Sequence, residues 1–590
     1  MSTTERNLGY AALLAESRRL DSTAPAKNKI KLALLSDAAT QRFVPILRAL
    51  FARQGVDAEI YEGPFDAIEL EVHDRNSGLY KFQPQVVVIL NSVQALRAVF
   101  LRPGTDAFTF VDTTSERITR VWDAIHSNIP ATILQSNFVL PYERFFGNFD
   151  QKVPQSMYAT VAALNSRIAE NARSRGSVLL CDVESIASWL GRQQWFEDRF
   201  WDSAKYLCAQ DCQPYVADSV VKIVMASLGQ VIKCVVVDLD NTLWGGVIGD
   251  DGLDGIQFSA HGEGEAFYRM QLYLRALKQR GIVLAVCSKN EVANALLPFE
   301  KHPEMVLRRE DFAAFVANWN DKAVNIRQIK ETLNIGFDSM VFLDDSPFER
   351  NLVRELVPGV VVPELPEDPA DYVRAISELN LFETTSFSAE DAKRTELYQA
   401  EATRREEQAG FASVEEFLQS LDMRITVARF DPFHLPRISQ LMQRSNQFNL
   451  TTRRLSEIEC KALMENPACL PLYAKLADRL SDHGLISIVT VETKPDTATL
   501  AIRDWLMSCR VLGRGVETFL MNQVVEHARK LGLARVTAEY IPTAKNAMVK
   551  DFFHQFGFEK IAEGPNGEAQ WHLLTAQYNP RPTFMKTVEP

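Results

Sequence analysis

The stretch IKCVVVDLDNTLWGG at residues 232–246 decides the fold of this chain. Its first six residues are apolar apart from Lys233 and predict a short strand buried on both faces, as in a parallel sheet. Asp238 and Asp240 follow at the carboxyl end of that strand, where open α/β sheets bind their ligands. Neighbouring carboxylates repel each other unless a cation neutralises them, and oxygen ligands of this kind suit Mg²⁺. The stretch therefore predicts a metal-dependent site at the edge of an α/β sheet.

Further polar side chains follow at the expected ends of later strands. Their order along the chain is a hydroxyl, a lysine and a second acidic pair, which together describe a phosphoryl-transfer site. The members are Ser288 and Asn290 after IVLAVC (282–287), Lys322 at the start of a helical segment (322–334), and Asp344 and Asp345 after MVFL (340–343). A lone Asp-x-Asp is usually a turn or a cap, but the full set in this order favours catalysis.

This set resembles the haloacid-dehalogenase-like (HAD) phosphotransferase superfamily, whose first motif Asp-x-Asp-x-Thr corresponds to residues 238–242. The resemblance implies that Asp238 is the nucleophile that forms an aspartyl-phosphate and that Asp240 is the general acid and base. It also implies that Ser288 and Lys322 bind the transferring phosphoryl group. The expected Mg²⁺ ligands are Asp238, Asp240, Asp344 and Asp345, and the expected substrate-binding residues of this domain are Thr242 and Asn290.

The intervals between these motifs are too short for a separate cap domain. Residues 245–264 form a glycine-rich flap, and a helical segment at 265–280 uses most of the remaining length before Ser288. We therefore expect an open site that admits a bulky substrate tethered to a protein.

The string CRVLGRG at 509–515 carries a second group of candidates. Its Arg-x-x-Gly-x-Gly element, with Arg510, Gly513 and Gly515, resembles the pyrophosphate loop of GNAT-type N-acyltransferases and predicts substrate binding. Cys509, beside an arginine and near a predicted helix start, is a candidate nucleophilic thiol. The alternative for this cysteine is a small buried apolar residue. His483 is a candidate base for the thiol, with a plain turn histidine as the alternative.

The combination of motifs resembles the FkbH-like proteins of HAD subfamily IIIC. The matching strings are DLDNTLWGGVIGDDG (238–252), NQFNLTTRR (446–454) and CRVLGRGVE (509–517). The resemblance implies transfer of a three-carbon acyl unit from a phosphorylated donor such as 1,3-bisphosphoglycerate to the phosphopantetheine arm of an acyl carrier protein, with loss of phosphate. Such thioesters serve polyketide and nonribosomal biosynthesis. Two alternatives stay open, a plain phosphatase and a non-enzymatic assembly scaffold.

The predicted fold class is α/β with three domains. An SGNH-hydrolase-like domain (1–225) precedes a HAD-like Rossmannoid core without a large cap (230–370), and a helical connector (371–421) leads to a GNAT-like α+β domain (422–590). Strand-like runs at 30–36, 85–92, 131–135 and 177–181 support the first domain. Ser36 and Asn91 follow two of these runs, as the SGNH pattern requires. The Gly-Asp-Ser context and an Asp-x-x-His motif are both missing, so this domain is expected to be inactive.

Composition excludes several other classes of protein. The 590 residues include 76 acidic and 64 basic ones, and the net charge of −12 argues against nucleic acid or an anionic membrane as a partner. Eight cysteines do not form a disulfide framework, and no second Cys/His pair accompanies Cys208 and Cys212 to bind zinc. The N-terminal residues lack the apolar core of a signal peptide, and no stretch is apolar enough to span a membrane. We expect a cytoplasmic enzyme.

Overall fold

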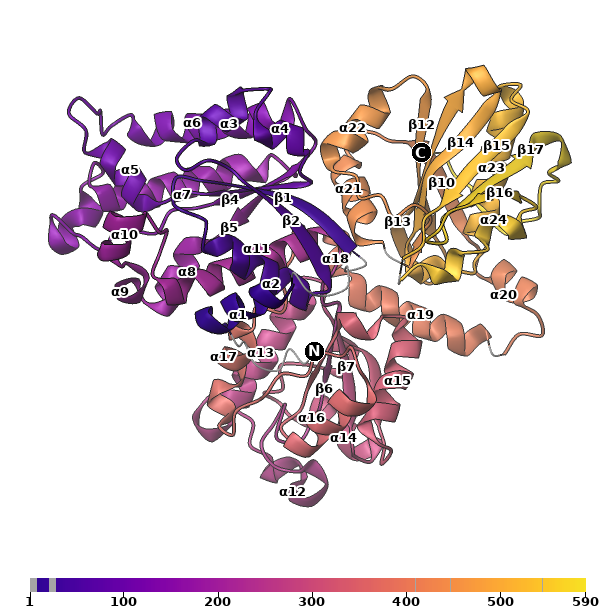
Figure 1. Ribbon diagram of the computed structural model, residues 1–590. Coiled ribbons are helices and arrows are strands. Elements are labelled where there is room, and N and C mark those ends of the chain that lie inside the picture. The colour runs from indigo at the N-terminus through magenta and orange to yellow at the C-terminus, as the bar shows by residue number, and fades with distance from the viewer. Residues whose placement is uncertain (1–7, 21–27, 409, 446, 544, 590) are drawn as a thin grey trace. The chain divides into compact units, whose positions relative to one another are not determined.

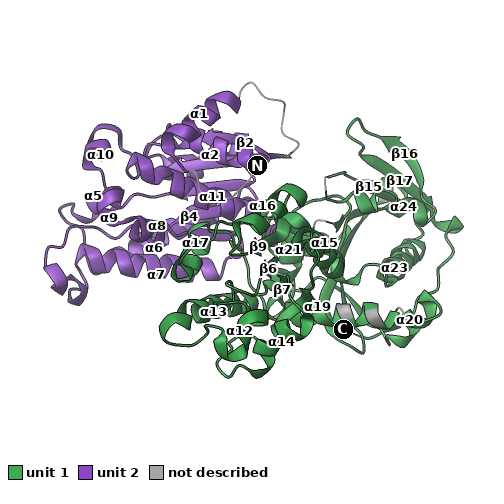
Figure 2. Cartoon of the chain, turned by 90° about the horizontal axis from the view of Figure 1, so that it is seen from below, with its two compact units in different colours: residues 1–6, 227–455, 460–590 green, residues 7–226, 456–459 purple. Residues whose placement is uncertain are grey.

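The structure, a computed structural model, describes residues 8–20, 28–408, 410–445, 447–543 and 545–589 (Figure 1). The first seven residues of the predicted N-terminal domain and Asn446 of the 446–454 string lie outside the described residues. Contacts divide the backbone into two compact units (Figure 2). The main segment of one unit is residues 7–226, and the other is formed from residue 227 onward apart from 456–459.

The N-terminal unit is built on a parallel sheet with the order β2-β1-β3-β4-β5. Helices lie on both sides of this sheet (Figure 1), which explains why β3 is buried at every position. The strands are β1 (Asn28–Ser36), β2 (Val56–Glu62), β3 (Val86–Leu90), β4 (Thr132–Ser136) and β5 (Val178–Cys181). The main helices are α2 (Phe43–Arg53), α3 (Ile68–His73), α5 (Val93–Phe100), α6 (Phe110–His126), α7 (Met157–Arg173), α10 (Asp198–Ala204) and α11 (Gln213–Ser227).

The second sheet, of order β8-β7-β6-β9, is also entirely parallel. Its strands are β6 (Cys234–Val237), β7 (Val283–Ser288), β8 (Phe312–Ala317) and β9 (Met340–Leu343). The helices around it are α12 (Ile248–Gly255), α13 (Glu265–Gln279), α14 (Val292–Lys301), α15 (Lys322–Leu333), α16 (Pro347–Leu356) and α17 (Tyr372–Glu378). Between residues 238 and 322, all of which are described, no inserted domain interrupts the α/β order. The apolar run GVVV at 359–362 forms only a single bridge with this sheet, between Val341 and Val361.

The segment expected to be a helical connector contains α18 (Ala389–Ala392), α19 (Arg394–Gln408) and α20 (Val414–Ser420). Helix α19 packs against β7, β8 and α15, and Tyr398 belongs to the hydrophobic core beneath the sheet. Gln399 donates hydrogen bonds to the carbonyl oxygens of Glu310 and Phe312 at 2.7 and 3.2 Å. This helix is therefore an integral part of the fold and not a free linker.

The third domain is α+β, with one long mixed sheet of order β16-β17-β15-β14-β13-β12-β10-β18 and β11 paired to β14. The strands are β10 (Arg424–Arg429), β11 (Phe448–Asn449), β12 (Cys469–Ala477), β13 (Asp482–Lys494), β14 (Thr499–Met507), β15 (Arg535–Tyr540), β16 (Glu559–Glu563), β17 (Ala569–Leu574) and β18 (Lys586–Thr587). The helices are α21 (Leu435–Arg444), α22 (Glu457–Glu465), α23 (Val516–Lys530) and α24 (Phe552–Gln555). No described helix is both long and apolar enough to cross a bilayer.

Candidate active site

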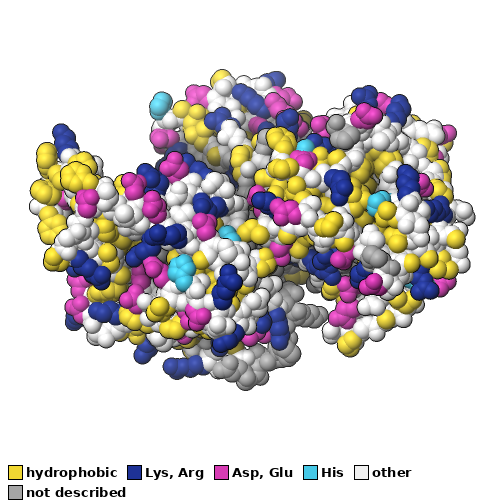
Figure 3. Space-filling model, turned by 90° about the horizontal axis from the view of Figure 1, so that it is seen from above, with side chains coloured by type: hydrophobic (Ala, Val, Ile, Leu, Met, Phe, Trp, Pro, Cys, Tyr) yellow, Lys and Arg dark blue, Asp and Glu magenta, His cyan; other side chains and the backbone are white. Residues whose placement is uncertain are grey.

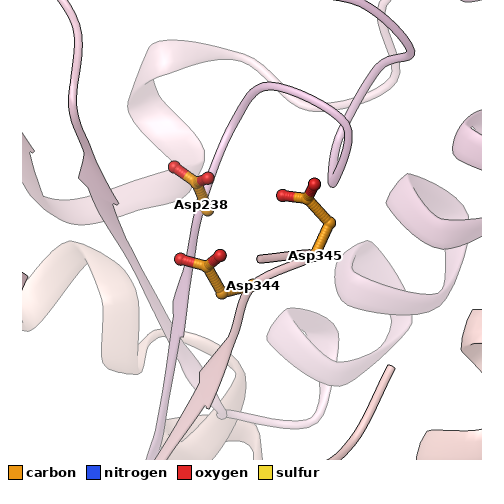
Figure 4. A group of neighbouring side chains, drawn as sticks. All are labelled: Asp238, Asp344 and Asp345. Carbon is orange, nitrogen blue, oxygen red and sulfur yellow. The ribbon is translucent and has the colours of Figure 1, made fainter. Parts of the chain in front are cut away.

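The carboxyl ends of β6 and β9 bring three aspartates together. The two strands are parallel neighbours with Val237 opposite Leu343, so the next residue of each strand, Asp238 and Asp344, lies at the same edge of the sheet. One carboxylate oxygen from each of Asp238, Asp344 and Asp345 lies within 4.8 Å of the others (Figure 4). Asp238 is 7% exposed and Asp344 is fully buried. The sequence predicted this grouping.

Lys322, the first residue of α15, provides the counter-charge that the sequence predicted. Its Nζ lies 2.9 Å from Asp238 Oδ2 and 2.5 Å from Asp344 Oδ2, and the residue is 3% exposed. Burial alone would lower the pKa of the lysine, but the two carboxylates outweigh it and raise the pKa above its ordinary value. Lys322 therefore stays charged and offsets one of the three acidic groups.

The remaining negative charge fits a divalent cation. Burial, together with the charge of Asp238, raises the pKa of Asp344 to about 7, and the same two causes raise the pKa of Asp345. Asp238 Oδ1 is buried and has no hydrogen-bond partner. An oxygen-only donor set with an unpartnered buried oxygen matches the preferences of Mg²⁺. Asp238, Asp344 and Asp345 would hold the ion.

Asp240 lies outside this metal-binding group, which differs from the prediction that it is a metal ligand. Its Oδ1 accepts hydrogen bonds from Trp244 Nε1 at 2.9 Å and from the Ile248 backbone N–H at 3.0 Å. Its Oδ2 accepts one from Asn290 Nδ2 at 2.7 Å. Burial raises the pKa of this carboxyl although the hydrogen bonds oppose the shift. A positioned carboxyl with a raised pKa is suited to proton transfer, the other role predicted for Asp240.

Thr242, Asn290 and Ser288 lie around these carboxylates. The buried Thr242 Oγ1 accepts a hydrogen bond from the Asp345 backbone N–H at 3.2 Å, so this residue positions a ligand of the ion. The side-chain amide of Asn290 donates to Asp240, so Asn290 is a positioning residue as well. Ser288 is 1% exposed at the end of β7, at the same edge of the sheet.

Two supporting residues were not predicted from the sequence. The buried Arg350 on α16 donates from Nη1 to the carbonyl oxygens of Asp344 and Asp345, at 2.8 and 2.7 Å, and fixes the backbone of both. Tyr372 donates its hydroxyl to the Asn241 carbonyl oxygen at 3.2 Å. The role of Arg350 could have been recognised from the sequence, because this arginine lies on the helix that follows the acidic pair. The role of Tyr372 depends on tertiary packing, and no local pattern indicates it.

The candidates of the third domain do not join this site through any contact among the described residues. Cys509 is half-buried in a 3₁₀ turn (Cys509–Val511), seven residues before α23 begins, so it does not lie at the helix start that was expected to activate it. The Arg510 guanidinium donates to Ser508 Oγ at 3.2 Å. Cys287 is fully buried and burial raises the pKa of its thiol, which makes it inert.

The glycine loop before α23 has the backbone expected of it but not free donors. Gly513 and Gly515 have φ of 76° and 81°, the left-handed region that favours glycine. The N–H of Gly513 donates to Glu517 Oε1 at 3.2 Å. The side chain of Arg514, between the two glycines, is 6% exposed and pairs with Glu401 and Asp478. Gly513 and Arg514 thus contact the chain itself, and ligand binding by Arg510, Gly513 and Gly515 stays a prediction.

His483 is a buried member of an ionic network, which contradicts the prediction of a base for Cys509. Arg514 Nη1 lies 2.8 Å from His483 Nε2, and since an arginine can only donate, the lone pair of that nitrogen is occupied. Burial, then the charges of Arg514 and Arg404, lowers the pKa of His483 to about 4. Arg404 on α19 meets Asp478 in the same network, at 2.8 and 2.9 Å. The histidine is structural.

A short segment closes the gap between β14 and β15. These parallel strands pair only over Thr499–Ile502 and 535–538 and then diverge. Residues 448–450 lie between the diverging ends, where the N–H of Leu450 donates to the Trp505 carbonyl and the N–H of Ile541 donates to the Leu450 carbonyl, at 3.0 and 2.8 Å. Asn546 Nδ2 donates to the Asn449 carbonyl at 2.9 Å. An extended ligand could reach these backbone groups only by displacing 448–450.

Comparisons with known proteins match different shares of this chain. Residues 31–225 match the family model described as the FkbH N-terminal domain. The search of curated proteins gave no match. Two acetyltransferase structures, the ribosomal-protein-S18-alanine N-acetyltransferase of Escherichia coli and the spermidine N-acetyltransferase of Vibrio cholerae, each cover 26% of this chain. They cover 94% and 98% of their own chains, at 14% and 16% identity and TM-scores of 0.21 and 0.22.

A second match covers more of the chain. The N-terminal part of the protein BF1531 of Bacteroides fragilis, which contains a phosphatase domain and was crystallised with Mg, covers 64% of this chain and 100% of its own. The identity is 37% and the TM-score is 0.60. The chain therefore belongs to the family of this Bacteroides fragilis phosphatase-domain protein, and its N-terminal domain is of the FkbH type.

Proposed function

We propose that this chain is a Mg²⁺-dependent phosphotransferase that removes phosphate from a phosphorylated three-carbon acyl donor and transfers the acyl unit to the thiol of an acyl carrier protein. One observation supports the removal of phosphate. Three carboxylates and a buried lysine meet at one sheet edge, with Asp238 Oδ1 unpartnered. The Mg-bound phosphatase-domain relative supports the choice of metal. The FkbH-type N-terminal domain supports the acyl half.

The phosphate step follows from the geometry. Mg²⁺ held by Asp238, Asp344 and Asp345 would supply positive charge for the phosphoryl oxygens. An oxygen of Asp238 bonds to phosphorus as the bond between phosphorus and the leaving oxygen of the donor breaks. Asp240 gives its proton to this leaving oxygen. Two hydrogen bonds occupy Asp240 Oδ1, so the proton moves through Oδ2. Asp240 then takes a proton from water as the water oxygen attacks phosphorus and releases Asp238.

The acyl transfer is a reaction separate from the phosphate step. With 1,3-bisphosphoglycerate as donor, the carrier thiolate attacks the carbonyl carbon, a C–S bond forms, and the C–O bond to the first phosphate breaks. The phosphotransfer site removes the second phosphate from the remaining ester. Because Cys287 is buried and inert, Cys509 is the cysteine to test as an intermediate acyl carrier.

The experiment is an intact-mass measurement of a holo carrier protein after incubation with the enzyme, Mg²⁺ and 1,3-bisphosphoglycerate. We expect a mass increase of one glyceryl unit and release of both phosphates of the donor. Asp238→Asn should release only the first phosphate and leave a phosphoglyceryl unit on the carrier. Asp250→Asn, the same change at an exposed position of α12, should leave the mass increase and the phosphate release unchanged. Loading at the wild-type rate in Cys509→Ala removes that cysteine from the pathway. No loading from any phosphoglycerate contradicts the acyl half of the proposal.

A plain phosphatase is the second candidate, and a specific observation favours it. The base predicted for Cys509 is not available, because the lone pair of His483 Nε2 is occupied by Arg514. Phosphate release that proceeds equally well without a carrier protein, with no mass change when one is present, would favour this candidate.

A further inference from the structure

The N-terminal unit contains a cavity of about 630 Å³ at the carboxyl edge of its sheet. The tips of β1, β3 and β4 form its base, and helices α3, α5 and α6 form its walls. Strands β2 and β3 lie on opposite sides of β1, so the strand order reverses between β1 and β3. Open α/β sheets leave a ligand crevice at such a reversal. The volume falls in the range of pockets that hold small molecules, roughly 300–1,000 Å³.

A chain of hydrogen bonds orients one carboxylate at the base of this cavity. Trp122 Nε1 donates to Gln135 Oε1 at 3.0 Å, and Gln135 Nε2 donates to Asn91 Oδ1 at 2.8 Å. Asn91 Nδ2 donates to Asp37 Oδ2 at 3.1 Å, and the Ser92 backbone N–H donates to Asp37 Oδ1 at 2.7 Å. Each oxygen of Asp37 therefore receives one hydrogen bond and keeps acceptor capacity.

This carboxylate has no counter-charge. Among the described residues no lysine or arginine forms an ion pair with Asp37, and burial raises its pKa to about 6. The predicted serine beside it is not a nucleophile, since Ser36 Oγ is 4% exposed and donates to the Leu90 carbonyl oxygen at 2.8 Å. A half-buried carboxylate without an ion pair is stabilised when a cation binds.

The rest of the lining is mainly apolar. Buried side chains of β3, α5, α6 and the loop after β4 surround the base; they are Ile89, Leu96, Ile118, Val121 and Phe138. Phe65 and Leu70 are 49% and 76% exposed and extend the apolar wall outward. In Figure 3, hydrophobic side chains lie at the surface of the N-terminal domain among acidic and basic ones. The other charged groups of the lining are Asp66, Glu69, Arg102, Arg117 and Lys205.

We propose that this cavity binds a small amphipathic amine, whose ammonium group donates hydrogen bonds to Asp37 and whose apolar body lies against the walls from α5 and α6. The ligand must donate a hydrogen bond because both Asp37 oxygens are acceptors. A cationic ligand is favoured because no described lysine or arginine forms an ion pair with this carboxylate. A ligand carboxylate would be repelled. The site lies within the N-terminal unit and is independent of the phosphotransfer site.

The test is calorimetric titration of the full chain with n-hexylamine, n-hexanol and hexanoate at pH 7. We expect hexylamine to bind with a Kd below about 1 mM, and hexanoate at least roughly tenfold more weakly. Asp37→Asn should weaken hexylamine at least roughly tenfold and leave hexanol within about threefold, which shows that the cavity is intact. Asp57→Asn, the same change at an exposed position of β2 outside the cavity, should leave all three affinities unchanged.

Acidity supplies a second readout. Hexylamine keeps its charge between pH 7 and pH 5 while Asp37 becomes protonated, so its affinity should fall roughly tenfold over that range. The Asp37→Asn variant keeps every other charged group of the lining, so the pH effect should disappear in it. Absence of hexylamine binding, equal binding of hexanoate, or unchanged hexylamine affinity in Asp37→Asn would each overturn the proposal.

Discussion

At the residue scale, the carboxyl group of Asp240 is held from three directions. Trp244, the Ile248 backbone and Asn290 all donate to Asp240, and each donor favours its ionised form. Trp244 is fully buried, so Trp244→Phe removes the indole donor while keeping most of the packing. We expect the pKa of Asp240 to rise further, the pH optimum of phosphate release to move upward, and kcat to fall roughly tenfold.

A matched change gives the control for that pH–rate measurement. Trp319 is 68% exposed and donates from Nε1 to Glu291 at 2.8 Å, away from the carboxylates. Trp319→Phe should leave the profile unchanged. An unshifted profile in Trp244→Phe would show that this hydrogen bond does not tune Asp240.

The sequence was sufficient to predict the residues whose position depends on a strand end. Asp238 and Asp344 were predicted because parallel strands bring their carboxyl ends to one edge, whereas Lys322 was predicted at the start of a helical segment. The sequence was insufficient to predict the direction in which a side chain points. The carboxylate of Asp240 turns toward Trp244 and not toward the metal-binding group. The lone pair of His483 is consumed by an arginine more than thirty positions away in the sequence, which no local pattern reveals.

At the element scale, α19 joins the ionic network of His483. The folded state keeps this histidine neutral down to about pH 4, whereas the unfolded chain protonates it near its ordinary value of 6.5. Between these values the unfolded state binds more protons, so stability falls as the pH is lowered from 6.5 to 4, by roughly 2–3 kcal/mol from this group. Denaturant midpoints measured across that range should show the slope, and His483→Gln should reduce it. An equal slope in the variant would exclude His483 as the cause.

The segment 448–450 gives the second prediction at this scale. This segment pairs with β14 and accepts a hydrogen bond from Ile541, just after β15. Acetyl-CoA should therefore not bind the third domain, and titration calorimetry should show no saturable heat. Asn546 is fully buried and bonded to the Asn449 and Ile541 carbonyl oxygens, so Asn546→Ala should cost about 1–3 kcal/mol of unfolding free energy. Tight saturable binding of acetyl-CoA to the wild-type chain would contradict this account.

The elements themselves were predicted unevenly. Strands β3, β6 and β9 are continuous apolar runs and were recognised from the sequence. Strand β2 reads VDAEIYE and exposes alternate residues at the edge of its sheet, so its apolar signal is weak. Strand β12 was not predicted either, because a proline and a lysine interrupt its apolar residues.

At the scale of the whole molecule, the two compact units share no sheet: the N-terminal unit has one sheet with its own core, and the other unit has two sheets with cores of their own. The metal-binding group and Lys322 all belong to the unit that starts at residue 227. Expressed alone, residues 227–590 should release phosphate within roughly threefold of the full chain's rate, measured with the same donor. Loss of phosphate release from a fragment that still melts cooperatively would show that the N-terminal unit contributes to the site.

Helix α19 has a mechanical consequence. One part of it is bonded to the phosphatase-type sheet through Gln399, and another part to the third domain through Arg404 and Asp478. Force applied to the ends of 227–590 must break this helix away from one neighbour before either domain can extend, and both neighbours then lose buried partners at once. In an optical trap we expect a single large rupture for 227–590, with no pause at the length of one domain.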